Sequence, residues 1–577
     1  MPFRAFSIAC LAHTLTHISA HTTYDTPPQL SDFDSLGVWF DGVMGIDDGL
    51  NIEPSQVKPN DTRIAIVGAG ISGLMTALLL DSVGLSNWEI LEASDRVGGR
   101  IETVYVEGTS PDDRQYQEMG AMRLPQYWKN DEGELLPIKD QHLVNQLADT
   151  LNTLNDGEDG DYHINFIPWI DSTENNFRDS NDRRLPDGSI PRVSDVKGSE
   201  RLSDPLTNDK EFNNEAISQT AHHADMQYTN AITLNGTLPQ LIADNIFLAH
   251  KLMIEAGLDD TNQYSLFKAL GYNATTYEEV MKYDIEGIWY RVFIDSAYDN
   301  AYNWTTVDKG FSRLTEAFIP LVRDSLHYHS RVDAVRLEGD SRVTLEWRDE
   351  LMHNRVSDTY DYAIISAPFS VVQSWHLPKF SSGLMNRAIR ELHYGSACKT
   401  ALQFSRRFWE EGEHAMGGGC DTTDAFYGIE TACYPPSTEN SVVLSSYAVS
   451  DAATRLVSWP RHRLIEQALK SLARSHGDVV FDTYTGENMY KCWLTDQNAA
   501  GAWAEPRQGQ HTLFMPEFHK THGGVVFVGE HTSVTHAWVS SAVMSAVRGV
   551  VQVLLDMGRV REAKLVTREW MWRWLEE

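Results

Sequence analysis

The pattern of hydrophobic and polar positions changes sharply at residue 63. Residues 21–60 have weak periodicity and are typical of an irregular arm. Residues 63–67 form a short apolar run typical of a buried strand, and residues 74–80 have the pattern of a helix packed on a sheet. A second apolar run at residues 88–91 predicts the next strand. The pattern therefore predicts a β-α-β unit near the start of the ordered chain.

The middle of the chain interrupts this α/β pattern. Residues 150–215 are polar and predict loops, whereas residues 238–258 and 262–300 have helical spacing. Strands return afterwards; they are expected at residues 330–337 and 342–347 as a hairpin, and at 362–366, 396–405, 441–449 and 525–528, followed by a helix over 540–555. We therefore expect a mixed α/β (α+β) fold in which a helical insertion separates two α/β portions.

Composition and charge narrow the class of protein. The 577 residues are enough for several domains, and 42% of them are hydrophobic. The net charge of −33 would repel a phosphate backbone, which argues against a nucleic-acid partner. No run of 18 apolar residues occurs, so a membrane span is not expected.

The cysteines and the termini leave alternatives open. The five cysteines contain no C-x-x-C motif, and free buried thiols are favoured over a pairing of Cys420 with Cys433.

Residues 1–20 resemble a signal peptide weakly, because two histidines interrupt the apolar run, so secreted and intracellular locations both stay open. Residues 569–575 carry three tryptophans and are expected to dock on the protein, with a partner or membrane contact as the alternative. His222 and His223 would point apart on a helix, so no metal site is expected.

A glycine motif predicts the first candidate site. Gly68, Gly70 and Gly73 form G-x-G-x-x-G directly between the first strand and its helix. The first glycine permits a tight turn, the second lets the backbone approach a pyrophosphate, and the third allows close packing of helix on strand. Glu92 ends the second strand, where an acid can bind ribose hydroxyls and disfavours a 2′-phosphate. The segment therefore predicts binding of FAD or NAD rather than NADP.

The following residues resemble a known family. The string Glu92–Arg100, with its two adjacent glycines, resembles the flavin-containing amine oxidase superfamily, which makes the expected cofactor FAD. Within that superfamily the chain is similar to L-amino-acid oxidases over most of residues 60–130 and 305–555. Five further strings carry this resemblance: 118–125, 392–399, 444–447, 527–532 and 536–539.

The resemblance implies roles for individual residues. Arg123 and Tyr447 would hold a substrate carboxylate, Lys399 would position a water near the flavin, and Ala537 and Trp538 would face the substrate amine and the flavin. The residues implied to bind FAD are Gly68, Gly70, Ile71, Ser72, Gly73, Glu92, Ala93, Gly99, Arg100, Gly120, Ala121, Met122, Arg123, Val332, Glu530, Ala537, Trp538, Val539, Ser540, Ser541 and Ala542. The alternatives are a structural ion pair for Arg123, a core position for Tyr447 and an exposed strand position for Lys399.

The resemblance also implies a domain plan. A Rossmann-like FAD-binding domain would be assembled from residues 61–105, 306–390 and 518–560, and a mixed-sheet substrate domain from 106–150 and 391–517. The helical insertion would occupy 151–305, between a leader and arm (1–60) and a C-terminal tail (561–577).

The expected reaction is FAD-dependent oxidative deamination of an L-amino acid, with O₂ as acceptor and release of a 2-oxo acid, ammonia and hydrogen peroxide. The planar, always-charged guanidinium of Arg123 suits bidentate binding of a carboxylate, which would orient Cα–H for hydride transfer to flavin N5. A helix that begins near Trp538 would direct its positive end towards the flavin. Homodimerisation is plausible by resemblance.

One position departs from the family pattern. Trp503 stands where an aliphatic residue is usual, so it would reshape the side-chain pocket, and large apolar or aromatic substrates are favoured. Ala502 occupies the place of the cysteine that carries covalent flavin in monoamine oxidases, which predicts non-covalent FAD. The family's disulfide positions do not match these cysteines. The alternatives kept are a monoamine- or polyamine-type oxidase, a tailoring oxidase of an amino-acid-derived metabolite, and a non-catalytic flavin-fold protein.

Overall fold

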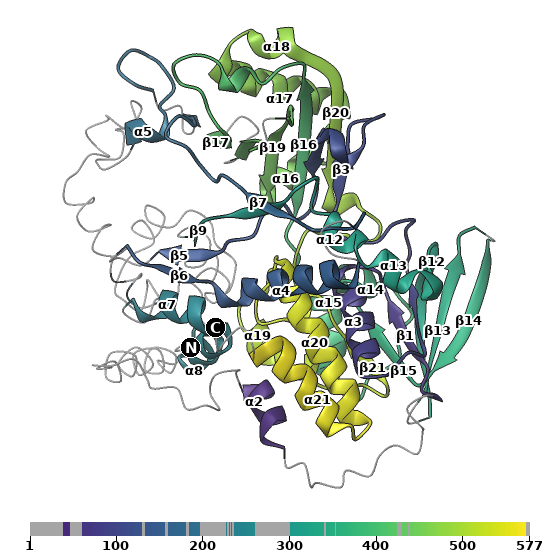
Figure 1. Cartoon of the computed structure of the whole chain (residues 1–577). Helices are drawn as coiled ribbons and strands as arrows, with labels where there is room; N and C mark the ends of the chain where they lie inside the picture. The colour runs from purple at the N-terminus through teal and green to yellow at the C-terminus, as the bar shows by residue number, and fades with distance from the viewer. Residues whose placement is uncertain are drawn as a thin grey trace, which may run out of the picture.

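A five-stranded parallel sheet lies in the lower right part of the molecule in Figure 1, where β1, β15 and β21 are labelled. In this computed structural model, the described residues are 38–46, 61–129, 133–155, 160–179, 184–196, 227, 230, 232, 236–259, 301–339, 342–351, 353–423, 430–436 and 439–572. The strand order is β11 (Leu326–His327), β2 (Trp88–Leu91), β1 (Ile64–Val67), β15 (Tyr362–Ile365) and β21 (Val525–Phe527). Neighbouring strands are all parallel, and β11, β15 and β21 come from segments far along the chain from β1 and β2. This confirms a Rossmann-like sheet assembled from separated parts of the chain.

Buried helices cover this sheet. Helix α3 (Ile71–Ser82) follows β1 directly, and helix α20 (Val539–Asp556) packs against α3. Among the described residues, α20 is the one helix that is long and apolar enough to cross a membrane, but 89% of it is buried inside the protein. Its apolar surface therefore belongs to the core, together with that of α4 (Lys139–Leu154) and α21 (Val560–Thr567).

A six-stranded mixed sheet forms the upper part of the molecule (Figure 1). Its order is β20 (Tyr484–Cys492), β16 (Ala397–Phe404), β19 (Val442–Val449), β18 (Glu430–Tyr434), β17 (Gly419–Thr423) and β8 (Arg178–Asp179). The expected strands at 396–405 and 441–449 are confirmed as β16 and β19. Their antiparallel register places Lys399 opposite Tyr447, and β20 places Lys491 on the other side of Lys399.

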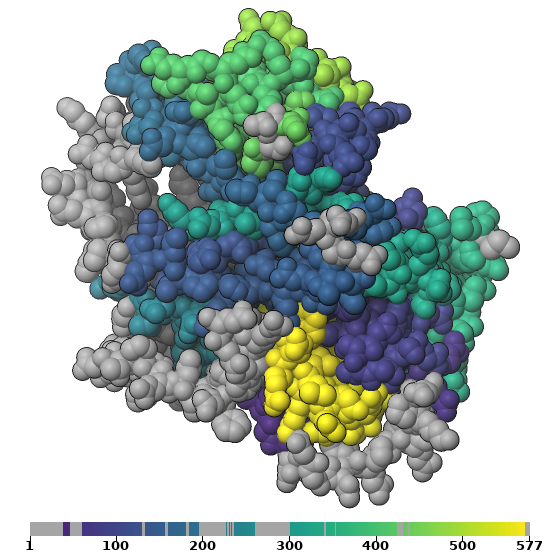
Figure 2. All heavy atoms as spheres, viewed as in Figure 1, coloured from purple at the N-terminus to yellow at the C-terminus, as the bar shows by residue number. Residues whose placement is uncertain are grey.

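Smaller elements connect the two sheets. The expected hairpin is present as β12 (Ser330–Glu338) and β13 (Arg342–Asp349), and β14 (Asn354–Tyr360) extends it to three strands. Figure 2 shows the blue segments around α4 as a band between the green upper sheet and the yellow C-terminal helices. Further α-helices are α5 (Val193–Val196), α7 (Thr237–Asp244), α8 (Ile246–Glu255), α12 (Arg313–Glu316), α13 (Ile319–Val322), α14 (Phe369–Val372), α15 (Gly383–Glu391), α16 (Ser450–Leu456), α17 (Arg461–His476), α18 (Val479–Thr483) and α19 (Gln510–Phe518). The short strands are β3 (Thr103–Tyr105), β4 (Tyr116–Glu118), β5 (Tyr127–Lys129), β6 (Leu135–Pro137), β7 (Phe166–Pro168), β9 (Ala301–Tyr302) and β10 (Thr305–Val307).

The structure differs from the prediction of an irregular N-terminal arm and agrees with the predicted docking of the C-terminal segment. Residues 21–60 are not irregular throughout, because helix α2 (Val38–Gly45) buries Phe40 and Val43 against the core beside α21. Docking of the C-terminal segment is confirmed for Trp570 and Met571, which are buried. Residues 1–20, the predicted helical segment 262–300 and the two adjacent histidines lie outside the described residues.

The expectation of free thiols is wrong for four of the five cysteines. Cys420 pairs with Cys433 across adjacent strands β17 and β18, and Cys398 pairs with Cys492 across β16 and β20. The second pairing joins residues 94 positions apart, which no local spacing reveals. Both bridges therefore tie together strands of the six-stranded sheet.

Candidate functional site

The three glycines of the motif lie where the expected roles require. Gly68 has φ +103°, a conformation that side chains rarely adopt. A Cβ on Gly73 would lie 2.0 Å from the carbonyl oxygen of Gly68, so only glycine lets α3 approach β1 this closely. A Cβ on Gly70 would meet no atom within 4 Å, which leaves the backbone open to a ligand.

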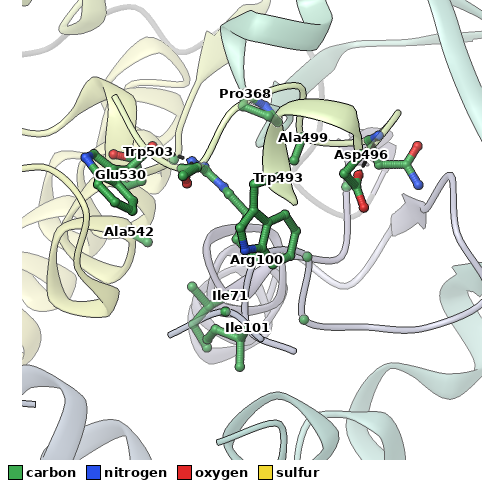
Figure 3. A pocket seen from close by; sticks show the side chains of 18 of the residues that line it. Ile71, Arg100, Ile101, Pro368, Trp493, Asp496, Ala499, Trp503, Glu530 and Ala542 are labelled. Atoms are coloured by element: carbon green, nitrogen blue, oxygen red, sulfur yellow. Dashed lines mark hydrogen bonds and ion pairs between the residues drawn. The ribbon is translucent and has the colours of Figure 1, made fainter. Parts of the chain in front are cut away.

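A cavity of about 640 Å³ lies along this loop and extends to the six-stranded sheet. Such a volume is within the range of ligand and cofactor sites. Figure 3 shows Trp503, Glu530 and Ala542 gathered on one side of the view and Asp496 and Ala499 on the other, with Arg100 and Trp493 between them. The predicted residues that line the cavity are Gly68, Gly70, Ile71, Ser72, Glu92, Ala93, Gly99, Arg100, Gly120, Ala121, Met122, Arg123, Val332, Lys399, Tyr447, Trp503, Glu530, Ala537, Trp538, Val539 and Ala542.

Three predicted residues do not line the cavity. Gly73 packs against the glycine loop itself. The Ser540 hydroxyl donates to Asp140 at 3.0 Å, and the Ser541 hydroxyl lies 2.6 Å from that of Thr535. Both serines are fully buried within the start of α20, so their side chains serve packing there.

Polar groups along the cavity suit a dinucleotide. The Glu92 carboxylate accepts hydrogen bonds from the Ala69 amide at 2.6 Å and from Ser94, which positions the acid at the end of β2. The first turn of α3 directs its amide groups towards the open Gly70 side, and helix N-termini favour phosphate. These residues fit the adenosine and pyrophosphate portions of FAD.

An ion pair also lines the cavity. Arg100 forms an ion pair with Glu530 at 2.7 Å, so the arginine expected to face a pyrophosphate is held by a carboxylate. Glu530 also accepts hydrogen bonds from the amides of Ala504 and Ala537. Three segments distant in sequence therefore meet at Glu530.

Lys399 is buried in the wall between the sheet and the cavity. Its Nζ atom lies 2.7 Å from the carbonyl of Gly120, 3.1 Å from that of Glu118 and 3.2 Å from the sulfur of Met122. Burial lowers the pKa of Lys399, although the neighbouring Glu118 charge opposes this. Burial likewise raises the pKa of Glu118. The exposed-strand alternative for Lys399 is wrong, because the side chain is 3% exposed.

Arg123 packs against two tryptophan rings that also contact each other. Its guanidinium carbon is 4.4 Å from the Trp169 ring centre and 4.5 Å from that of Trp304, which is within cation–π range of both rings, and the two ring centres lie 5.9 Å apart. Its Nη1 atom is 2.8 Å from the Oδ1 atom of Asp171. The ion-pair alternative for Arg123 is therefore present, but Arg123 also lines the cavity. The indole of Trp304 further packs 6.1 Å from that of Trp538.

Tyr447 and Trp503 form the adjoining wall. The Lys399 Nζ lies 4.7 Å from the Tyr447 ring centre. Desolvation raises the pKa of Tyr447, while the Arg123 charge lowers it and that of Glu505 raises it. The Trp503 indole donates from Nε1 to Glu505 Oε1 at 2.8 Å, so the ring is anchored.

Several site residues were not expected. Trp169 and Asp171 lie in a segment whose polarity predicted loops, and they reach the site through pairing of β7 with β10. Trp304 precedes β10, and Glu505 follows the cavity-lining Trp503 closely in sequence. For Glu505, the sequence held one signal: it lies two residues after Trp503 on the same irregular segment, so both side chains could be expected near the cavity.

The described residues contain no group of three or more histidines, cysteines or acids that could hold a metal ion.

A parallel sheet with a glycine loop, a terminal acid and a cavity reaching a second sheet defines a dinucleotide-dependent oxidoreductase. Residues 71–554 match the model of the flavin containing amine oxidoreductase family, so the chain belongs to that family. An L-amino-acid oxidase of Neurospora crassa is 34% identical over 97% of this chain and 80% of its own length. An L-amino-acid oxidase of Siganus canaliculatus is 26% identical over 86% of each. Cyclohexylamine oxidase from Brevibacterium oxydans has the same fold, with a TM-score of 0.53 and 15% identity over 88% of this chain and 99% of its own.

Proposed function

We propose that this protein is an FAD-dependent L-amino-acid oxidase that converts an L-amino acid and O₂ to a 2-oxo acid, ammonia and hydrogen peroxide. The observation that carries the proposal is Arg123 on the wall of the cofactor cavity, together with Tyr447 and Lys399. Membership of the flavin amine oxidoreductase family and the L-amino-acid oxidase relatives support it.

The cavity residues supply the cofactor site. The glycine loop and the start of α3 would hold the pyrophosphate, and Glu92 would bind ribose hydroxyls. A bound FAD would supply the two-electron oxidant that takes up a hydride from the substrate, with O₂ as the final electron acceptor. Ala502 lies at the cavity where monoamine oxidases carry a cysteine, and we propose that the FAD is held without a covalent bond.

Arg123 and Tyr447 would bind and orient the substrate carboxylate. The two tryptophan rings and the Asp171 carboxylate contact the guanidinium and hold it at the cavity wall. Charge-assisted hydrogen bonds to a guanidinium are strong and directional, and they fix the position of Cα relative to the cavity. The Tyr447 hydroxyl would add a neutral donor.

Lys399 would hold a water molecule. Burial favours the neutral amine at Nζ, which donates to the carbonyl of Gly120 and can accept a proton from water or from the substrate ammonium. Removing the ammonium proton is required before the Cα–H bond can be oxidised. The backbone carbonyls around Nζ keep it in one position.

The test measures hydrogen peroxide release from purified yellow protein with the 20 L-amino acids, several D-enantiomers and matched decarboxylated amines. We expect turnover of L-amino acids only, and in Arg123→Ala a fall in kcat/KM of roughly 10- to 1,000-fold from loss of a charged hydrogen-bonding partner. The control Arg387→Ala removes an exposed arginine that pairs within its own helix with Glu391, and it should match the wild type. Turnover of amines that is unaffected by Arg123→Ala would place the protein among amine oxidases instead.

Two further parts of the proposal have separate tests. Acid precipitation should leave the yellow colour in the supernatant, whereas a yellow pellet would contradict non-covalent FAD. The domain plan given above and a homodimer are also proposed; limited proteolysis and light scattering test them.

A further inference from the structure

A buried carboxylate lies in the part of the cavity where the substrate side chain is expected. The Glu505 side chain is 9% exposed and lines the same cavity as Arg123 and Tyr447. Its segment is held by backbone hydrogen bonds to the segment before β16: Gly395 donates to Trp503 at 2.9 Å, and Glu505 donates to His393 at 2.9 Å. The position of this carboxylate is therefore set by main-chain pairing.

The neighbouring residue leaves room for this group. A Cβ on Gly395 would lie 2.1 Å from Oε1 of Glu505, so the carboxylate occupies space that only a glycine leaves. The Oε2 atom of Glu505 lies 3.7 Å from Nε2 of His393. Burial, together with the charge of the neighbouring Arg507, lowers the pKa of His393 and favours the neutral imidazole beside Glu505.

The Glu505 carboxylate lies next to the aromatic ring of Trp503. Trp503 donates its indole N–H to Glu505, so ring and carboxylate form one fixed unit. A carboxylate has about four acceptor positions, so it can serve the indole and a ligand together. Cations bind both to tryptophan faces and to carboxylates.

Opposite charges flank Tyr447. The pKa of its hydroxyl responds to Arg123 in one direction and to Glu505 in the other, which places the tyrosine within electrostatic range of both. An amino acid held by its carboxylate at Arg123 and Tyr447 would therefore have a negative group available to its far end.

We propose that Glu505 is a specificity-determining residue that favours L-amino acids with a basic side chain, such as an ammonium or guanidinium group, and disfavours acidic ones. This inference rests on the proposed function. This substrate preference replaces the preference for apolar or aromatic side chains that Trp503 alone suggested, because the Trp503 ring is hydrogen-bonded to the Glu505 carboxylate.

The test compares substrates of nearly equal shape that differ in charge: L-arginine with L-citrulline, and L-lysine with L-norleucine. For the wild type we expect kcat/KM to favour the basic member roughly tenfold or more, the size of one charged hydrogen bond. In Glu505→Gln the amide oxygen can still accept from the Trp503 indole, and we expect the preference to fall close to one. Glu466→Gln, an exposed position on α17, is the charge-matched control and should keep the wild-type preference.

A binding measurement separates specificity from turnover. Changes in flavin absorbance report binding of 5-guanidinopentanoate and of its neutral isostere 5-ureidopentanoate, neither of which carries an α-amine. The wild type should bind the guanidino acid more tightly, and Glu505→Gln should bind the two about equally.

Equal use of basic and neutral substrates by the wild type, with both still dependent on Arg123, would overturn the role of Glu505 and leave the oxidase assignment intact. No oxidation of any amino acid would instead overturn the oxidase assignment. The binding measurement with the guanidino acid and the neutral acid would then still show whether Glu505 selects a cationic group.

Discussion

The proposed role of Arg123 predicts that Asp171 competes with a substrate carboxylate for the guanidinium, so that replacing Asp171 should strengthen carboxylate binding. Its Oδ1 atom lies 2.8 Å from Arg123 Nη1, and its side chain is 55% exposed. Trp169 and Trp304 both contact the guanidinium, so Asp171→Asn should leave Arg123 in place. The variant removes one negative charge from the edge of the guanidinium and adds no bulk.

The size of the effect follows from Coulomb's law. Two carboxylates on one guanidinium lie roughly 5 Å apart, and their repulsion is about 0.8 kcal/mol at a dielectric constant of about 80 and about 1.7 kcal/mol at about 40. These energies correspond to roughly 4- to 15-fold in a dissociation constant. Because Asp171 is half-exposed, the lower end is expected at high salt.

The assay titrates the oxidised protein with benzoate and follows flavin absorbance at low and high ionic strength. Asp171→Asn should bind benzoate more tightly, and the gain should shrink with salt. Asp112→Asn, which breaks the 2.5 Å pair with Lys309, is the matched control. Unchanged or weaker binding in Asp171→Asn, with binding lost in Arg123→Ala, would refute competition and show that Asp171 orients the guanidinium instead.

Three other changes test the site and the fold. Lys399→Met should lower kcat/KM roughly 100-fold or more, since proton transfer by a positioned group contributes about that much; flavin content measured by absorbance should stay normal, and unchanged kinetics would remove Lys399 from the mechanism. Burial lowers the pKa of His536 to about 3, so the unfolded chain binds the extra proton below about pH 6.5, and stability falls as the pH drops through this window, by about 2 kcal/mol at pH 5. His536→Gln should show a smaller fall in urea midpoint between pH 7 and pH 5 than the wild type, because it lacks this titrating imidazole. The raised pKa of Asp140 acts in the opposite direction, but it is present in both proteins and does not affect the comparison. An equal fall would contradict the burial argument. Replacing Cys420 and Cys433 by serine should cost about 2–4 kcal/mol, measured as a lower Tm, and a reducing agent should lower the Tm of the wild type more than that of the variant.

The sequence alone was sufficient to predict those parts of the structure that depend on the conformation of a few consecutive residues. A glycine loop between an apolar strand and a helix is constrained by backbone sterics within a few residues, so Gly68, Gly70 and Gly73 lie as expected. The apolar runs of the parallel strands are recognisable for a similar reason, because burial on both faces requires continuous hydrophobic residues. Helix α2 was missed because eight residues hold too little periodic pattern to stand out from the arm.

Tertiary structure decided what surrounds the cavity. Trp169 and Asp171 belong to a polar segment with no strong pattern, and they reach Arg123 because β7 pairs with β10, more than 130 residues further along the chain. The pairing of Cys398 with Cys492 likewise depends on strand register. Short-range sterics and periodicity therefore determined the cofactor loop and the class of fold, and the resemblance of several sequence strings indicated the family. Long-range packing decided which charges and aromatic rings surround the cavity, because such contacts join residues whose separation along the chain carries no local signal.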